Sequence, residues 1–267
     1  MGHQPRKRFG QHFLHDAGII NGIVAAVNPM PGDHLVEIGP GEGAITLPLL
    51  QRAQKMTVIE LDRDLVPRIK AMTASLGEVD VIQADVLKVD LAELAGDRKL
   101  RIVGNLPYNI SSPILFHCID QLDVIDDMHF MLQKEVVDRM AAEPGSKVYG
   151  RLSVMLQLAC VVEPLFDVPP SAFRPPPKVD SAIVRLIPRP ASERPSALLP
   201  TISRIVRAAF GQRRKTLSNA LNGVASIMQM RDAGIDPADR AEQLPPSAFV
   251  RLALVLAKSE AVDRVSR

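Results

Sequence analysis

The stretch of this sequence with the most distinctive chemistry is residues 102–109, Ile-Val-Gly-Asn-Leu-Pro-Tyr-Asn. The β-branched pair at its start is typical of the end of a buried strand, and Pro107 stiffens the turn that follows. That turn presents the primary amide of Asn105 and the flat ring of Tyr108. An amide and a ring at the carboxyl end of a strand suit one task, which is to hold the edge and the face of a planar ring that bears an amine. The alternative is an ordinary strand-to-helix loop in which Asn105 caps the helix.

Glycines and acids follow the other predicted strands at comparable positions. Gly39 and Gly41 follow a predicted strand at residues 34–38. Glu60 ends a second predicted strand at residues 56–60, and Asp85 ends a third at residues 79–85. The glycine pattern is GxGxG with Glu42 inside it, and carboxylates beside the loop disfavour a phosphate and favour a cationic ligand. Glu60 lies 21 positions after Gly39, where an acid can bind both ribose hydroxyls, and Asp85 could accept a hydrogen bond from an adenine amine.

Adenine, ribose and a cationic tail without a phosphate together describe S-adenosylmethionine, whose product after methyl transfer is S-adenosylhomocysteine. The sequence therefore favours a site for this cofactor at the carboxyl ends of successive strands, where open parallel sheets bind their ligands. The alternative for each position is a helix-capping acid or a structural glycine turn.

A sulfonium methyl donor beside the turn suggests a mechanism. The side-chain oxygen of Asn105 and the carbonyl oxygen of Leu106 can accept both N–H groups of an adenine amine and aim its lone pair at the methyl group. Catalysis would then rest on positioning and electrostatics, without a strong base. Pro107 holds the turn, and Tyr108 would stack on the base after it leaves its own helix or loop. Phe173, on a loop rich in proline, could cover the other face of the base or fill the core.

Alternating strands and helices must position these residues. We predict strands at residues 34–38, 56–60, 79–85, 100–103, 127–133 and 179–187, and helices at 16–27, 44–54, from Asp62 or Asp64 to about 72, 113–122 and 135–142. Residues 152–162 read as a helix that changes into a strand, and five prolines in residues 169–177 exclude both a helix and a central strand. Short strand–helix links predict an α/β fold with a doubly wound, mostly parallel sheet, which is the Rossmann-like methyltransferase fold. We expect an arm at 1–15, a catalytic domain that binds S-adenosylmethionine at 16–190 and a small all-helical domain at 191–267.

Charge is distributed unevenly along the chain. The net charge is +2, but residues 193–267 hold 12 Lys and Arg against seven Asp and Glu. Basic residues at both ends indicate an anionic partner such as RNA, although charged runs are more often solvated surface. The candidate RNA contacts are Arg6, Lys7 and Arg8 in the arm and Arg213, Arg214 and Lys215 in the helical domain.

Nothing in the sequence indicates a metal site, a disulfide framework or a membrane segment. Two cysteines are too few for such a framework, and neither CxxC nor HExxH occurs. The N-terminus has no apolar core of signal-peptide length, and the chain contains no run of about 18 apolar residues. We expect a cytoplasmic monomer that needs no metal.

Longer motifs extend these candidate sites over most of the chain. They are RKRFGQHFLHD, VEIGPGEGAIT, VIELDRDL, QADVLKVD, VGNLPYNISSPILF, HFMLQKEVVDRM, YGRLSVMLQ, VPPSAFRPPPKVDSAIVRL and AFGQRRKTLSNAL. With them the chain closely resembles the ribosomal RNA adenine N6,N6-dimethyltransferases. The most similar branch is the bacterial one that dimethylates two adjacent adenosines near the 3′ end of small-subunit (16S) RNA. NLPYN together with FRPPPKVDS is far more specific than any glycine loop.

This resemblance implies residue roles and a substrate. His12 stands where the family often has asparagine, and a backbone contact would survive that change. The implied substrate is 16S RNA in the small ribosomal subunit or its precursor, which receives four methyl groups, two per adenosine, during ribosome biogenesis. The implied cofactor contacts are His12, Leu14, Gly39, Glu60, Asp85 with its neighbour Val86, and Asn105, with the base stacked on Tyr108.

Three other functions remain open. A relative that methylates large-subunit RNA and confers macrolide resistance would share the catalytic motifs, although the QRRKT stretch and FRPPPKVDS argue against it. A nicotinamide-dependent dehydrogenase would bind a dinucleotide, and Glu42 inside the glycine loop argues against a phosphate there. A non-catalytic ribosome-assembly module would bind RNA equally well without Asn105.

Overall fold

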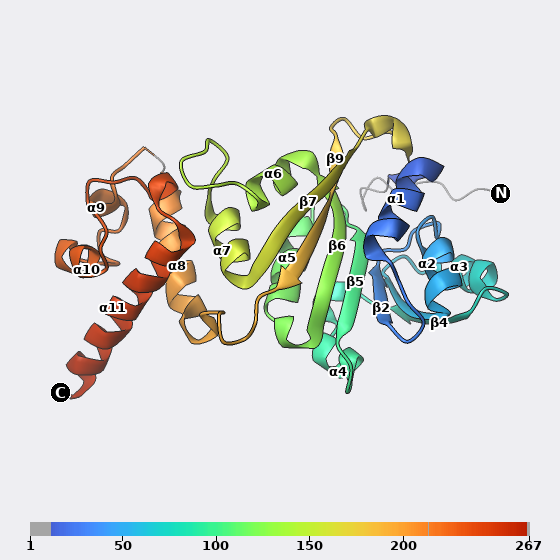
Figure 1. The fold of residues 1–267 in the computed structure, drawn as a ribbon, viewed down its shortest axis with the longest axis horizontal. Coiled ribbons are helices and arrows are strands. Elements are labelled where there is room, and N and C mark those ends of the chain that lie inside the picture. The colour runs from blue at the N-terminus through green and yellow to red at the C-terminus, as the bar shows by residue number, and fades with distance from the viewer. Residues whose placement is uncertain (1–11, 213, 266–267) are drawn as a thin grey trace. The chain divides into compact units, whose positions relative to one another are not determined.

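A seven-stranded sheet organises the first of the two units into which the chain divides. The computed structural model describes residues 12–212 and 214–265. The strand order is β4-β3-β2-β5-β6-β9-β7 (Figure 1). The strands are β2 (His34–Ile38), β3 (Lys55–Glu60), β4 (Glu78–Gln83), β5 (Leu100–Asn105), β6 (Ile125–Gln133), β7 (Cys160–Val168) and β9 (Ser181–Pro188).

The order of the strands creates a crevice beside β2. Pairing is parallel from β4 through β3 and β2 to β5 and β6, and antiparallel between β6 and β9. The chain runs outward from β2 to β4 and then returns to β5 on the other side of β2, so the direction of winding reverses there. Ligands bind at such a reversal, outside the carboxyl ends of the strands. This topology confirms the predicted doubly wound, mostly parallel sheet.

Helices connect the strands and begin where the sequence supplies a cap or a turn. Asp16 caps α1, because its carboxylate accepts the N–H of Ile19 at 3.0 Å. Asp90 caps α4 in the same way, accepting the N–H of Ala92 at 2.8 Å. The helices of this part of the chain are α1 (Ala17–Val27), α2 (Thr46–Ala53), α3 (Val66–Thr73), α4 (Leu91–Ala95), α5 (Ser111–Ile119) and α6 (Lys134–Met140).

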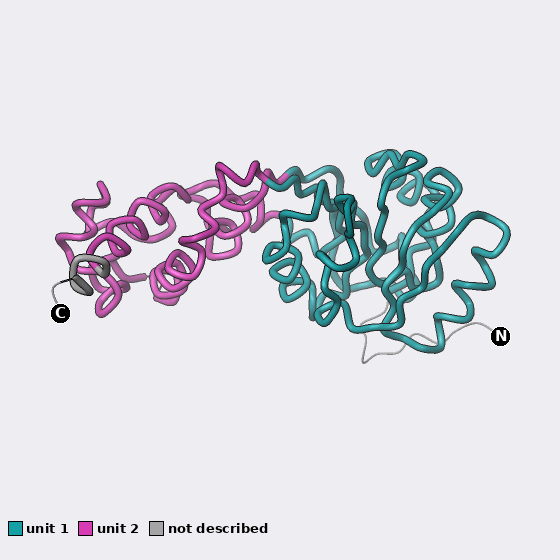
Figure 2. Tube along the Cα trace, turned by 90° about the horizontal axis from the view of Figure 1, so that it is seen from below, with its two compact units in different colours: residues 1–137, 163–188 teal, residues 138–162, 189–267 magenta. Residues whose placement is uncertain are grey.

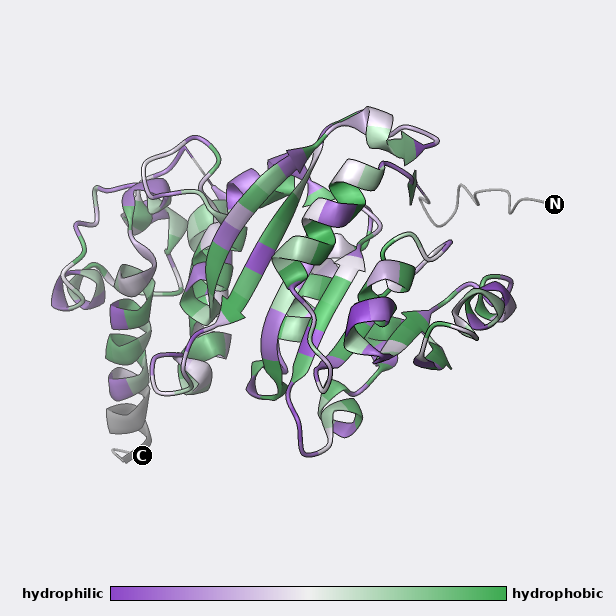
Figure 3. Ribbon diagram, turned by 45° about the vertical axis from the view of Figure 1, so that its right-hand side comes forward, coloured by the Kyte–Doolittle hydropathy of each residue, from purple (hydrophilic) through white to green (hydrophobic). Residues whose placement is uncertain are grey.

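The core lies on both faces of the sheet, whose strands are largely hydrophobic along their length (Figure 3). On one face, Leu35 and Val103 join a cluster that includes Val24 of α1 and Leu50 of α2. Because successive residues of a strand point to opposite faces, the neighbours of Leu35 and Val103 supply the second core, and α5 buries Ile114 against it. Each fully buried aliphatic side chain contributes about 1.5–3 kcal/mol. The carboxyl ends of the strands are therefore held rigidly.

The N-terminal arm is tied to the proline-rich loop by a second, two-stranded sheet. β1 (Phe13–Leu14) pairs antiparallel with β8 (Phe173–Arg174), and the N–H of His15 donates to the carbonyl of Ala172 at 2.9 Å. A single 3₁₀ turn, η4 (Pro170–Ala172), precedes β8. Strands of two residues leave no periodicity in the sequence, so the pairing of these two segments could not be predicted.

The second unit is helical and takes in more of the chain than the sequence suggested (Figure 2). It comprises residues 138–162 together with 189–267, whereas the sequence analysis assigned 138–162 to the catalytic domain. One physical reason is Tyr149, which is fully buried and donates its hydroxyl to the carbonyl of Leu244 at 2.8 Å. Its ring also meets Phe210 edge to face, with centroids 5.9 Å apart. The helices are α7 (Arg151–Ala159), α8 (Leu199–Gly211), α9 (Leu217–Ala220), α10 (Ile227–Asp232) and α11 (Pro246–Val265).

Two further features concern the described part of the chain. None of its helices is both long and apolar enough to cross a bilayer. Cys118 and Cys160 are both buried free thiols.

Candidate active site

The first element of the site is the loop between β2 and α2. Gly39 and Gly41 have φ of +68° and +58°, a backbone region that residues with a Cβ rarely adopt. A Cβ on Gly41 would also lie 3.3 Å from the ring of Phe13 in the arm. The loop is tied to the sheet by the N–H of Gly39, which donates to the carbonyl of Ile59 at 2.9 Å. These glycines therefore let the backbone turn tightly beside the space that a ligand would fill.

Glu60 at the end of β3 fastens this loop from the opposite side. Its carboxylate accepts the N–H of Asp62 at 2.7 Å and the N–H of Gly41 at 3.4 Å. The residue is only 6 % exposed, and burial raises the pKa of its carboxyl group above the usual range. A carboxylate has about four lone-pair positions, so acceptor capacity remains for a ligand hydroxyl.

Glu37 is a second buried acid below the loop. Its Oε2 accepts the hydroxyl of Thr46 at 2.6 Å, and burial raises the pKa of its carboxyl group to about 8. The nearby carboxylate of Glu60 contributes to this increase, and the hydrogen bond from Thr46 opposes it. The burial of Glu37 and its hydrogen bond with Thr46 depend on the fold and could not be predicted from the sequence pattern.

Asp85 follows β4 and caps the short 3₁₀ helix η2 (Val86–Lys88). Its carboxylate accepts the N–H of Leu87 at 3.1 Å. Val86 beside it is buried, and both residues line the same pocket. A carboxylate and an apolar side chain at this edge match the amine and the face of an adenine ring.

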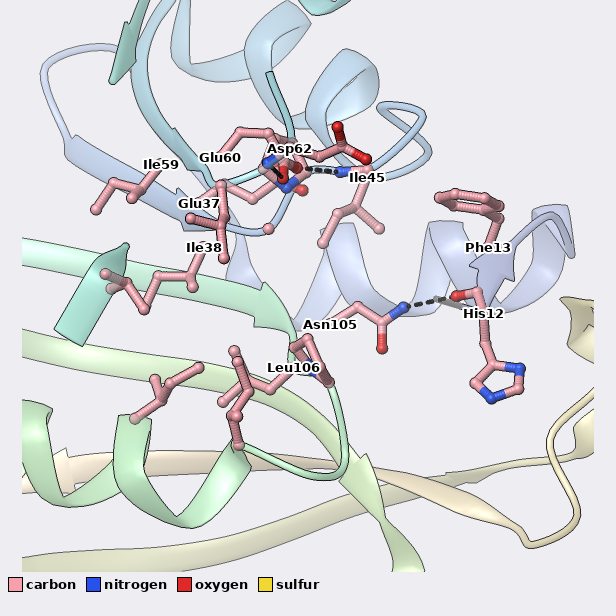
Figure 4. Close-up of a pocket in the computed structure, with 18 of the residues that line it drawn as sticks. His12, Phe13, Glu37, Ile38, Ile45, Ile59, Glu60, Asp62, Asn105 and Leu106 are labelled. Carbon is pink, nitrogen blue, oxygen red and sulfur yellow. Dashed lines mark hydrogen bonds between the residues drawn. The ribbon is translucent and has the colours of Figure 1, made fainter. Parts of the chain in front are cut away.

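These elements enclose one pocket of about 260 Å³ within the first unit (Figure 4). It extends from the glycine loop to the turn after β5. The structure brings to it almost every site residue predicted within the described chain: His12, Leu14, Gly39, Gly41, Glu60, Asp85, Val86, Asn105, Leu106, Pro107 and Tyr108. Phe13, Ile45 and Ile114 give the pocket apolar walls. The sequence pattern does not reveal these three residues as part of a site, because only the pairing of the arm and the packing of the helices bring them there.

The amide of Asn105 has a fixed orientation at the mouth of this pocket. Its Nδ2 donates to the backbone carbonyl of His12 at 3.2 Å (Figure 4). The carbonyl can only accept, so this bond makes the nitrogen face the arm and leaves the side-chain oxygen as the open acceptor. Next to it, the N–H of Leu106 donates to the carbonyl of Met131 at 3.2 Å and ties the turn to β6. These two bonds fix the turn at Asn105 and Leu106 between the arm and β6.

The ring of Tyr108 is held from two sides. Its hydroxyl lies 2.6 Å from Oγ of the fully buried Ser181, and its pKa is raised by burial. The imidazole of His12 lies over its face, with ring centroids 5.8 Å apart and planes at 24°. A flat ring with a fixed tilt can serve as a stacking surface for a base.

Phe173 does not line this pocket. Its side chain is only 2 % exposed and belongs to the core cluster with Leu14, its partner in the β1–β8 pairing. The sequence left two roles open for Phe173, and the structure places its side chain in the core and not beside the pocket. The reason is the β1–β8 pairing, which turns the side chain of Phe173 inward.

The remaining predicted sites lie elsewhere. Arg214 and Lys215 are exposed in the helical unit, after α8. Arg6, Lys7, Arg8 and Arg213 lie outside the described residues. Within the described ranges, no group of three or more His, Cys, Asp or Glu side chains is arranged to hold a metal ion.

The residues of the pocket fit S-adenosylmethionine. The loop offers backbone groups and no basic side chain for a phosphate, and the acidic side chains of Glu60 and Asp85 border it. Burial raises the pKa of both Glu37 and Glu60, and strongly shifted pKa values are common among acids at functional sites. A phosphate-bearing dinucleotide would meet negative charge instead, so this geometry argues against the dehydrogenase alternative.

Comparison with known proteins points to one family. The chain matches the family model described as "Ribosomal RNA adenine dimethylase" over residues 2–258. It is 60 % identical over 250 residues to the protein named ribosomal RNA small subunit methyltransferase A of Xylella fastidiosa (strain Temecula1 / ATCC 700964), covering 93 % of this chain and 94 % of that protein. It is 59 % identical over 253 residues to the protein of the same name from Xanthomonas campestris pv. campestris (strain B100), covering 94 % and 95 %.

Two solved structures resemble the whole chain. The dimethyladenosine transferase of Plasmodium falciparum has a TM-score of 0.78 at 29 % identity, covering 92 % of this chain and 98 % of that one. The 23S rRNA methyltransferase ErmE has a TM-score of 0.71 at 26 % identity, covering 92 % and 99 %. Both similarities include the sheet and the helical C-terminal region.

Proposed function

The chain belongs to the ribosomal RNA adenine dimethylase family, and on that premise we propose that it methylates the N6 amines of two adjacent adenosines near the 3′ end of 16S RNA. The methyl donor is S-adenosylmethionine, and the substrate is the small ribosomal subunit or its precursor. The observation that carries this proposal is the orientation of Asn105. Its nitrogen is bound to the arm, and its oxygen is left beside the pocket that Glu60 and Asp85 border.

The cofactor site is the part of the pocket between the glycine loop and β4. When bound, S-adenosylmethionine supplies an electrophilic methyl group on a sulfonium. Glu60 would hold the ribose hydroxyls, and Asp85 the adenine amine with Val86 against its ring. Backbone groups at Gly39 and Gly41 and the arm residues Leu14 and His12 would complete the site, with His12 contributing its backbone.

The acceptor amine is activated by position. The side-chain oxygen of Asn105 and the carbonyl oxygen of Leu106 accept hydrogen bonds from its two N–H groups, which raises electron density on the nitrogen and aims its lone pair at the methyl group. Pro107 keeps the two acceptors in one rigid turn, and Tyr108 holds the base by stacking. The alkylated amine is acidic enough to lose its proton to water, so no residue need act as a strong base.

The RNA must be held outside the pocket by cations. We assign this role to Arg6, Lys7 and Arg8 of the arm and to Arg213, Arg214 and Lys215 of the helical unit, because clustered basic residues track a phosphate backbone. The relatives that are 58–60 % identical carry the small subunit in their name, and this supports 16S RNA as the substrate. We further propose that the protein acts in the cytoplasm as a monomer.

One experiment tests this function. Purified protein is incubated with labelled S-adenosylmethionine and either small or large ribosomal subunits isolated from cells that lack the modification. We expect label in 16S RNA and none in 23S RNA. Because ErmE is named a 23S rRNA methyltransferase and shares the fold, label in 23S RNA alone would transfer the proposal to the large subunit. Absence of label in both would overturn it.

A further inference from the structure

The imidazole of His12 packs against the ring of Tyr108 in a stacked arrangement. The ring centroids are 5.8 Å apart and the planes are 24° from parallel. The Nδ1 atom of His12 lies 2.7 Å from the carbonyl oxygen of Pro175, in the loop after β8. A carbonyl only accepts hydrogen bonds, so Nδ1 carries the proton and the ring is held in this orientation.

A base cannot enter between the imidazole and the ring of Tyr108 at the observed spacing. Stacked carbon atoms approach to about 3.5 Å, so a base between two rings needs them about 7 Å apart. The observed separation of 5.8 Å is smaller. Either the imidazole leaves when the base enters, or the two rings move apart.

The backbone and the ring of His12 are held by different contacts, which favours departure of the ring. The backbone carbonyl accepts the amide of Asn105, and the next two residues pair with β8. Among the residues that the structure describes, the ring has one hydrogen bond, to Pro175, and one ring contact, to Tyr108. A rotation about the side-chain bonds of His12 therefore removes the imidazole without disturbing the arm or the orientation of Asn105.

We propose that His12 is a resting-state cover of the Tyr108 face and that the target adenine displaces it. This proposal rests on the proposed function, since it identifies the displacing ligand as an adenine base extruded from RNA. The displacement gives a specificity that a bare ring would lack. A ligand must stack on Tyr108 and also bind the acceptors of the turn before it outweighs the hydrogen bond and the ring contact that it replaces.

Steady-state kinetics with small subunits test the proposal. His12→Ala removes the ring and keeps the backbone carbonyl that orients Asn105. His15→Ala is the matched control, because His15 is exposed and lies three residues further along the arm. For His12→Ala we expect the KM for the RNA substrate to fall roughly three- to tenfold, as loss of one hydrogen bond and one ring contact implies, with the change in KM rather than in kcat. His15→Ala should leave the KM unchanged.

Every other kinetic result overturns the proposal. A higher KM for RNA in His12→Ala would mean that the imidazole is a second stacking surface for the base. A loss of S-adenosylmethionine affinity with an unchanged KM for RNA would mean that the ring serves the cofactor. An unchanged KM for both substrates would mean that the contact has no role in base entry.

Fluorine NMR observes the contact itself and does not depend on turnover. The chain has two tyrosines and no tryptophan, so fluorotyrosine labelling gives one signal for Tyr108 and one for Tyr149, assigned with Tyr149→Phe. We expect His12→Ala to move only the Tyr108 signal. A single-stranded RNA rich in adenosine should also move the Tyr108 signal of the unaltered protein, because the base replaces the imidazole beside that ring.

The NMR result separates two kinds of failure. If the RNA moves the Tyr108 signal but no methyl group is transferred, the proposed function fails while the displacement stands. If methyl transfer is observed and the Tyr108 signal does not respond to bound RNA, the displacement fails while the function stands.

Discussion

Replacing Asn105 by alanine tests the catalytic turn. The change removes the amide oxygen that we assign to the acceptor amine, and it also removes the Nδ2 bond of 3.2 Å to the carbonyl of His12. Nothing else in the pocket is altered, because Leu106 keeps its backbone bond to Met131. The two losses affect different measurements.

The magnitudes differ accordingly. The bond between Asn105 and His12 is a half-buried neutral hydrogen bond worth about 1 kcal/mol, so the midpoint of thermal unfolding should fall by about 2–4 °C. The amide oxygen faces the charge that develops on the amine in the transition state. One preorganised hydrogen-bonding group of this kind stabilises the transition state by about 3–4 kcal/mol. We therefore expect kcat to fall by roughly 10²- to 10³-fold.

Three assays separate these effects. Methyl transfer to small subunits gives kcat, titration calorimetry gives the affinity for S-adenosylmethionine, and filter binding gives the affinity for RNA. Only kcat should fall steeply in Asn105→Ala. Asn109→Ala is the matched control, since Asn109 also lines the pocket but is exposed and lies beyond the turn. Full activity of Asn105→Ala would refute the mechanism, and a parallel loss of RNA binding would show that Asn105 acts in binding alone.

Three further predictions follow from the fold and its charges. Gly104→Ala should lower the free energy of unfolding by about 1–3 kcal/mol in urea titrations, because its Cβ would lie 2.8 Å from the carbonyl oxygen of Ile38. Burial raises the pKa of Glu37 to about 8 from its usual 4.5, so between these values the folded protein holds a proton that the unfolded chain has released. Stability should therefore decrease as pH rises through this window, by about 1 kcal/mol per pH unit relative to Glu37→Gln, when unfolding is compared between about pH 5 and pH 8. Arg214→Ala and Lys215→Ala should each reduce the slope of log affinity for RNA against log salt by about 0.7–0.9, measured by filter binding over a salt series.

Matched variants make these predictions decisive. Gly211→Ala places a Cβ where no atom lies within 4 Å and should change stability little; an equal loss in both glycine variants would remove the steric argument. Glu42→Gln changes an acid that is 44 % exposed and should leave the pH dependence intact. Arg231→Ala removes an exposed charge in the same unit as Arg214 and should keep the salt slope.

The strand ends were the part of the site that the sequence could predict. Gly39, Glu60, Asp85 and Asn105 each follow a hydrophobic run that is long enough for one buried strand, and parallel strands bring their carboxyl ends to one edge. In the structure these four residues line one pocket. Local pattern was sufficient because each residue is positioned by its own strand.

Contacts between distant segments could not be predicted in this way. The β1–β8 pairing joins residues about 160 positions apart and involves two residues on each side, so it leaves no periodicity. This pairing buries Phe173 and places the ring of His12 on Tyr108. The place of residues 138–162 in the helical unit could not be predicted for the same reason. The hydrogen bond from Tyr149 to Leu244 joins positions 95 residues apart.

The central claim is that one pocket presents an extruded adenine amine to a methyl donor, twice at each of two adjacent positions. Nucleoside analysis by mass spectrometry tests it most directly, using 16S RNA digested after incubation of unmodified small subunits with S-adenosylmethionine and either the unaltered protein or Asn105→Ala. The account predicts two N6,N6-dimethyladenosines per subunit with the unaltered protein and almost none with the variant. A methylated nucleoside other than adenosine, or equal dimethylation by both proteins, would contradict it.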